Sequence, residues 1–181
     1  MNKLNSTSRN TVLATELGIQ TFEELLVFLK ALPYGRNKNR KDLSLVLTEK
    51  QGTCSSKHGF AKLVADENNI NCKLLCVMYN LNVQNTPQAT AIYEKYGIKE
   101  TPEAHCILEF EEKLYDLTFP ESNIEELIPD IIQRKEVSPS WLEKDKIQYH
   151  QSFMKEWLRH QSVNYTFDEV WKIREEMIQS L

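Results

Sequence analysis

The sequence lacks several features that mark membrane, secreted and nucleic-acid-binding proteins. Its 181 residues contain no apolar stretch long enough to cross a bilayer, and the polar segment 1–10 has no apolar block like that of a signal peptide. The net charge is −4 and the isoelectric point is about 5.7, which argues against general nucleic-acid binding. We therefore expect a cytoplasmic protein without a nucleic-acid or membrane partner.

Cysteine is also scarce, and the spacing of Cys54, Cys72, Cys76 and Cys106 does not resemble the disulfide framework of a small secreted domain. Cys72 and Cys76 share a face of a predicted strand, but positions i and i+4 of a strand lie roughly 13 Å apart, too far for a disulfide. The sequence predicts reduced thiols, with Cys72 and Cys76 in the core.

The length and the 41% hydrophobic content are sufficient for one domain with a proper core. We expect a single domain over 1–181, with its core at about 20–137 and a C-terminal helical extension at about 138–181 packed on that core. His150 and His160 fall on a polar part of this extension and are expected to be solvated.

Hydrophobic periodicity and capping signals predict a mixture of helices and strands, and therefore an α+β fold. Residues 43–47 are short and apolar, and fit either a strand or one helical turn. Beyond Val137 the pattern contains no strand signal. The predicted helices are 22–32, 54–67, 88–96, a short helix from Asn123 toward Gln133, 141–161 and 167–180; the predicted strands are 72–81, 103–110 and 113–119.

Cys54 lies where a helix is expected to begin. Gly52 and Thr53 end the preceding apolar run, and apolar residues then recur at helical spacing on one side of the segment 54–67. Unpaired backbone N–H groups and the helix dipole favour a negative charge at such a position, and so lower the pKa of a thiol. The same N–H groups could hold an oxyanion. The alternative is a small apolar residue at a helix start.

His105 and Asp116 follow on two successive predicted strands. Glu111 and Glu112 form a short charged turn between them, and a two-residue loop would pair Phe110 with Lys113. In that register the two side chains lie on one face as diagonal neighbours, whereas a three-residue loop would put them on opposite faces. Asp116 could then fix the tautomer of His105. The alternative is an ordinary ion pair on a surface hairpin.

The order of these residues resembles the transglutaminase-like branch of the papain-like cysteine fold. That family often has Gly-x-Cys at a helix start, a strand with histidine, a turn, and a strand that ends in Asp-x-Thr; here these pieces are Gly52 to Cys54, His105, and Asp116 to Thr118. The resemblance covers about residues 51–118, and the motif at 52–58 looks like that of a bacterial-type group in this superfamily. Cys106 replaces a common aromatic residue, and Leu117 replaces a common proline.

The resemblance implies an antiparallel sheet with a cysteine-bearing helix packed on it. It also implies Cys54 as nucleophile, His105 as base and Asp116 as the residue that orients the base. The expected reaction is acyl transfer or amide hydrolysis through a thioester, on a small-molecule or peptide amide or acyl substrate, without a cofactor. Gln51, Thr53 and His58 are expected at the cleft or the oxyanion site.

A zinc site is an alternative to this chemistry. Cys54, His58 and His105 could supply three zinc ligands. Cys106 cannot easily join His105, because adjacent strand residues point to opposite faces. Four ligands are therefore hard to assemble, and we expect no metal. His58 is expected to flank the cleft or to make a local hydrogen bond.

A basic loop precedes the cysteine segment, with Arg36, Lys38, Arg40 and Lys41. It fits a solvated loop, or a basic rim that attracts an acidic substrate or a phosphate-bearing acyl carrier.

Two other functions stay open at this point. One is a non-catalytic binding module on the same fold, in which the cleft is occluded or Cys54 lies out of reach of His105. The other is a coenzyme-A-dependent acyltransferase, for which the sequence offers the basic loop but no glycine-rich phosphate loop.

Overall fold

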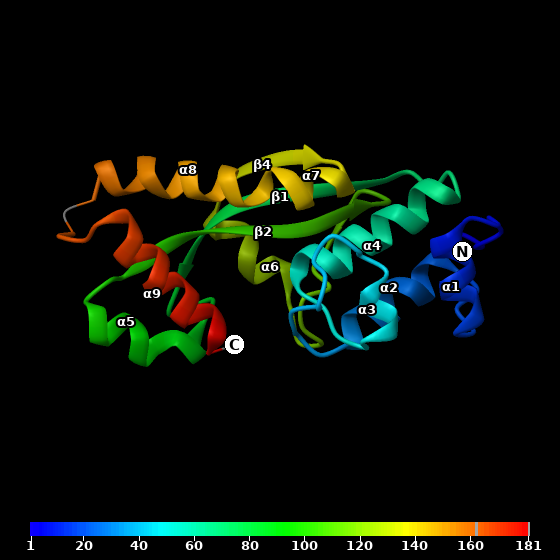
Figure 1. Cartoon of the computed structure of the whole chain (residues 1–181), viewed down its shortest axis with the longest axis horizontal. Coiled ribbons are helices and arrows are strands. Elements are labelled where there is room, and N and C mark those ends of the chain that lie inside the picture. Colours follow the sequence, from blue (N-terminus) through cyan, green and yellow to red (C-terminus); the bar gives the residue numbers. More distant parts are fainter. Residues whose placement is uncertain (162, 181) are drawn as a thin grey trace.

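A four-stranded antiparallel sheet crosses the middle of an elongated molecule (Figure 1). The structure is a computed structural model that describes residues 1–161 and 163–180. The strand order is β3-β2-β1-β4. The strands are β1 (Cys72–Asn82), β2 (Glu100–Phe110), β3 (Lys113–Tyr115) and β4 (Ile131–Val137). Helices accompany this sheet, so the predicted α+β class is confirmed.

The helices lie before, between and after the strands in the chain. They are α1 (Arg9–Glu16), α2 (Phe22–Ala31), α3 (Leu45–Thr48), α4 (Cys54–Glu67), α5 (Thr90–Tyr96), α6 (Ile124–Leu127), α7 (Pro139–Lys144), α8 (Lys146–Arg159) and α9 (Phe167–Gln179), with short 3₁₀ turns η1 (Pro87–Ala89) and η2 (Ile128–Asp130). Within the described residues no helix combines the length and the apolar character needed to cross a membrane.

Strands β1 and β2 form the centre of the sheet and pair along their whole length, from Cys72 opposite Phe110 to Asn82 opposite Glu100. Successive β1 residues point to opposite faces, and each face buries its own hydrophobic cluster. Cys76 belongs to the cluster under α2 and α4, whereas Val77 belongs to the cluster that includes α5 and α9 residues. Because both faces of β1 are buried, its sequence is apolar at successive positions and does not alternate between apolar and polar residues.

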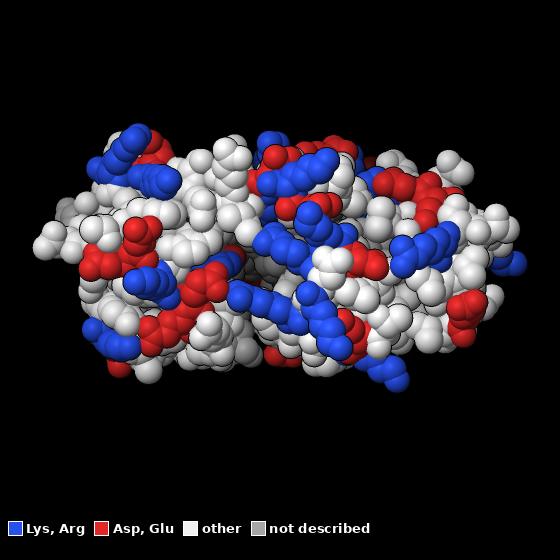
Figure 2. All heavy atoms as spheres, in the orientation of Figure 1, with Lys and Arg blue, Asp and Glu red and all other residues white. Residues whose placement is uncertain are grey.

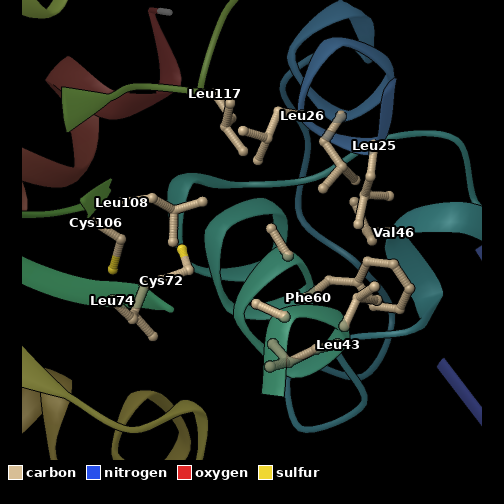
Figure 3. Packing of buried hydrophobic residues seen from close by; sticks show 14 of the residues in the cluster. Leu25, Leu26, Leu43, Val46, Phe60, Cys72, Leu74, Cys106, Leu108 and Leu117 are labelled. Carbon is tan, nitrogen blue, oxygen red and sulfur yellow. The ribbon is translucent and has the colours of Figure 1, made fainter. Parts of the chain in front are cut away.

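The larger cluster fixes α4 against the sheet. Figure 3 shows Phe60 of α4 near Leu25 of α2, with Leu74 and Leu108 coming from the strands. Phe60 is fully buried, and burying such a side chain contributes about 1.5–3 kcal/mol. The start of α4, where Cys54 lies, is therefore held by the core that follows it.

The hairpin between β2 and β3 has the predicted two-residue loop. Phe110 pairs with Lys113, and Glu111 and Glu112 both have positive φ values of 49° and 61°. Two successive left-handed residues form a type I′ turn, whose twist matches that of the flanking strands. The strand 113–119 was predicted too long, because β3 ends at Tyr115. The next residues turn instead toward the start of α4.

Two further predictions were wrong, and one helix was not predicted. The helix predicted from Asn123 toward Gln133 stops early, since Pro129 cannot continue it, and the next residues form β4 beside β1. The segment 141–161 is two helices, divided at Asp145. Helix α1 was not predicted at all. Strand β4 escaped detection because an edge strand with mostly exposed residues shows no apolar alternation.

Glu112→Gly should increase the free energy of unfolding by about 0.5–1 kcal/mol, because glycine adopts positive φ without the steric penalty of a side chain. The matched control is Lys113→Gly in β3, where φ is not positive, and this change should lose about 0.5–1 kcal/mol. Urea denaturation measures both values. Equal destabilisation by the two variants would contradict the type I′ turn.

Candidate functional site

A cavity of about 610 Å³ lies where the loop after α2 meets α4, β2, α8 and α9. Cys54 and Ser55 line it from the first turn of α4, and Lys146 lines it from α8. Figure 2 shows a hollow near the middle of the molecule, with Lys and Arg side chains gathered beside it. Cys54 is partly buried in this cavity, so the structure brings together a thiol and an enclosed space.

The local sequence explains why α4 begins at Cys54. Thr53 is the N-cap, and it forms a capping box with Ser56 in which each side chain accepts from the other residue's backbone N–H. A Cβ atom at Gly52 would lie 2.7 Å from the Val46 side chain, so this approach requires glycine. Within the described residues, the backbone N–H groups of Cys54 and Ser55 donate to no protein atom. They are free to hold a negative charge.

His105 and Asp116 lie together as the hairpin parity predicts. His105 Nε2 is 3.1 Å from Asp116 Oδ2. The other carboxylate oxygen accepts the Thr118 hydroxyl at 2.6 Å and the Thr118 backbone N–H at 2.9 Å. Burial raises the pKa of Asp116, but the charge and hydrogen bond of His105 outweigh it and hold that pKa below its ordinary value.

His105 is held in its charged form by its two neighbours. Burial lowers its pKa, but the charges of Asp116 and the Cys54 thiolate raise it to about 10. Nε2 faces Asp116 at 3.1 Å. The arrangement therefore fits an imidazolium between a carboxylate and a thiolate.

Several groups lower the pKa of the Cys54 thiol below its ordinary value. The largest contribution is a hydrogen bond from Cys106, followed, against the opposing effect of burial, by the charges of Lys146 and His105. The same hydrogen bond raises the pKa of Cys106, which stays a thiol and donates. The Cys106 sulfur lies 3.8 Å from Ser55 Oγ. Cys106 is thus a core residue that also reaches the site.

Lys146 is the residue nearest to Cys54 that the sequence did not suggest. Its Nζ donates to Cys54 Sγ at 3.4 Å and to Ser55 Oγ at 2.8 Å. Burial lowers its pKa, but the acidic groups of Cys106, Cys54, Cys76 and Glu103 raise it above the ordinary value. Lys146 lies 92 positions from Cys54 in the sequence. The two residues meet only because α8 docks beside the start of α4, and no local sequence pattern indicates such a contact.

Two basic side chains of α4 tie the Asp116 segment to the helix. Lys57 Nζ, fully buried, donates to Leu32 O at 2.5 Å and to Thr118 O at 2.8 Å. His58 Nδ1 lies 2.7 Å from Cys54 O, and its Nε2 accepts the Leu117 N–H at 2.8 Å. Because Nε2 accepts, Nδ1 carries the proton. Burial lowers the pKa of His58 to about 4, so the ring is neutral.

The three residues expected at the cleft have different positions. Thr53 lines the cavity as the helix cap. His58 makes the local hydrogen bond that was one of its two expected roles. Gln51 does not line the cavity: its amide donates to Arg36 O at 3.1 Å, and its side chain lies against Gly35. The oxyanion role expected for Gln51 is therefore better suited to the free N–H groups at Cys54.

The zinc ligands considered from the sequence do not form a site. Both ring nitrogens of His58 are occupied by backbone groups. Among residues 1–161 and 163–180, no group of three His, Cys, Asp or Glu side chains is placed to hold a metal ion.

The expectation that His150 is solvated was wrong, because α8 packs it against β2. His150 is 3% exposed, and its Nε2 donates to Pro102 O at 2.8 Å. Next to it, the buried Glu103 carboxylate accepts hydrogen bonds from Arg174 of α9, through Nε at 2.6 Å and through Nη2. These contacts hold α8 and α9 against the strand that carries His105. His160 is exposed, as expected.

The basic loop is divided between two environments. Arg36, Lys38 and Arg40 line the cavity, whereas Lys41 lies outside it and pairs with Glu143 at 3.1 Å.

Comparison of this chain with protein-family models, with curated proteins and with solved structures finds no match. The site therefore has to be interpreted from its own geometry.

Cys54→Ala should change the free energy of unfolding by no more than about 1 kcal/mol, since Cys54 is partly buried and sits at a cavity wall. Cys76→Asp should cost several kcal/mol, because it places a carboxylate in a fully buried strand position. Chemical denaturation of both variants compares them. A large loss in Cys54→Ala would favour a purely structural role for Cys54.

Proposed function

We propose that this protein catalyses acyl transfer or amide hydrolysis through a thioester on Cys54. The observation that carries the proposal is the position of the Cys54 sulfur at a helix start, 3.4 Å from Lys146 and close enough to His105 for their charges to shift each other's pKa, with His105 paired to Asp116. The order of Cys54, His105 and Asp116 also resembles that of transglutaminase-like enzymes. A transglutaminase-like core is part of this proposal.

In the first step the Cys54 thiolate attacks the carbonyl carbon of the substrate, and a C–S bond forms while the carbonyl electron pair moves to oxygen. The oxyanion is stabilised by the free N–H groups of Cys54 and Ser55. The intermediate then collapses and breaks the C–N bond. His105 gives its proton to the leaving amine, which leaves neutral, and the thioester remains.

In the second step neutral His105 accepts a proton from water or from an amine acceptor, which attacks the thioester carbonyl. The C–S bond breaks, and the thiolate leaves to re-form the ion pair with protonated His105. Water yields a carboxylic acid and an amine yields a new amide. Asp116 keeps the imidazole oriented throughout, through its contact with Nε2.

Lys146 has a separate role in this scheme. Its ammonium group stabilises the thiolate before attack, in addition to the imidazolium. Its hydrogen bond to Ser55 fixes its direction. Cys54 therefore has two cationic neighbours, so its reactivity should not depend on His105 alone.

Iodoacetamide at mildly acidic pH should label Cys54 long before Cys72, Cys76 and Cys106, which are buried. His105→Ala should reduce this excess rate, since one of the two cations near the thiolate is lost, and Asp116→Asn should weaken it by disturbing the histidine tautomer. Peptide mapping of the alkylated protein gives each rate. Cys54→Ala controls for labelling elsewhere.

One labelling result would contradict the proposed activation of Cys54. Slow labelling of Cys54, with a rate that rises only near the free-thiol pKa of about 8.5 and that ignores His105→Ala, would rule out the activated nucleophile. It would favour the alternative of a non-catalytic binding module.

The pH profile of acyl transfer should be bell-shaped. The lowered pKa of Cys54 places the acid limb below the range of a free thiol, because the thiolate is lost only when pH falls through that lowered value. The raised pKa of His105 places the alkaline limb near pH 10, where the proton needed by the leaving group is lost. Turnover or acylation measured from pH 4 to 11 tests both limbs. An alkaline limb near pH 6.5, as in an isolated histidine, would contradict the scheme.

A further inference from the structure

We infer that the substrate of this site carries an anionic group, a carboxylate or phosphate, close to the reacting carbonyl. This inference rests on the proposed function and names the substrate class. It follows from three features of the cavity: its charge balance, the pairing of its charged side chains, and the change at Lys146 when the thioester forms.

Positive charge is concentrated in this cavity although the chain as a whole is acidic. The net charge of the chain is −4, yet five basic residues line the cavity against two acidic residues. Figure 2 shows the basic side chains gathered beside the hollow. The concentration is therefore a property of the fold and not of the composition.

The two acidic residues of the lining are already paired. Glu175 accepts from Arg36 at 2.7 Å and also contacts Arg174. The Glu103 carboxylate forms an ion pair with the Arg174 guanidinium. By contrast, Lys38 and Arg40 have no carboxylate within 4.0 Å in the part of the chain that the structure describes. Two cations at the cavity are thus left for a ligand.

The ammonium group of Lys146 loses its anionic partner during the reaction. Before attack, its Nζ faces the Cys54 thiolate. When the thioester forms, the sulfur becomes neutral, and no carboxylate of the described residues lies within 4.0 Å of Nζ. An anionic group on the substrate would replace the lost partner. Such a substrate is therefore held more tightly in the transition state and the acyl-enzyme than in the first encounter.

The remaining wall of the cavity limits the size of the substrate. Leu142, Ile147, Trp171 and Ile178 provide apolar surface, and a volume of about 610 Å³ suits a small molecule or a few residues of peptide. The best fit is a short chain with an apolar part and an anionic end.

Two matched pairs of probes test this inference. The first pair is mono-p-nitrophenyl succinate and its methyl ester, which differ only in the anion on the acyl side. The second pair is S-acetyl mercaptoacetate and S-acetyl mercaptoacetamide, which differ in the anion on the leaving side. The rate of Cys54 acylation is followed by mass spectrometry of the intact protein, with Cys54→Ala as the blank.

In at least one pair the anionic member should acylate Cys54 about tenfold faster, and added salt should reduce this preference. The double variant Lys38→Gln/Arg40→Gln should lower the preference severalfold, through slower acylation by the anionic members. The control is Lys99→Gln/Lys113→Gln, which removes the same charge from exposed positions outside the cavity. It should keep the wild-type preference.

Two outcomes would overturn the inference, and they are distinguishable. Acylation of Cys54 at equal rates within both pairs, or an equal loss of preference in the two double variants, overturns the anionic substrate and leaves the proposed function intact. No acylation of Cys54 by any of the four probes overturns the proposed function and the inference with it.

Discussion

Two buried basic side chains of one helix turn, Lys57 and His58, hold the candidate site together. Lys57 joins Leu32, which follows α2, to Thr118, and His58 joins Cys54 to Leu117. Each contact satisfies a backbone group that the fold removes from water, and an unsatisfied buried group costs about 1–3 kcal/mol. Two separate segments of the chain, at Leu32 and at Leu117–Thr118, are therefore fixed relative to one helix.

The two side chains have different electrostatic costs. Burial lowers the pKa of Lys57 to about 8, against the opposing charges of Asp116 and Cys54, so its ammonium form is retained at neutral pH at some cost in stability. His58 avoids that cost because it is neutral. In this arrangement Asp116 is directed to His105 by backbone contacts of the two residues that follow it, Leu117 and Thr118.

The sequence allowed the local parts of this arrangement to be predicted, because each has a local cause. Thr53 is a helix cap, so α4 begins at Cys54. The Glu111-Glu112 pair forms a two-residue turn, so His105 and Asp116 lie on one side. Such features depend on a few neighbouring residues, whose propensities and periodicity are visible in the sequence.

The distant parts were not predictable in the same way. Lys146 faces the site and His150 faces the sheet only because α8 packs on β2. The residues around them in the sequence predict a polar helix and do not indicate either contact. The strand β4 has an exposed pattern and is recognisable only beside β1. Gln51 was placed at the oxyanion because it is close to Cys54 in sequence, but backbone pairing at Gly52 turns it to the Arg36 carbonyl. Tertiary packing decided each of these cases.

The distance of 92 positions between Lys146 and Cys54 links chemistry to the completion of folding. A chain in which α4 and the sheet have formed, but α8 has not yet docked, holds a thiol without one of its two cationic neighbours. Contacts between residues so far apart in sequence require the closure of a long loop and tend to form late. The full set of groups that lower the pKa of Cys54 would then be assembled only in a finished molecule, and its thiol would be less ionised in a folding intermediate.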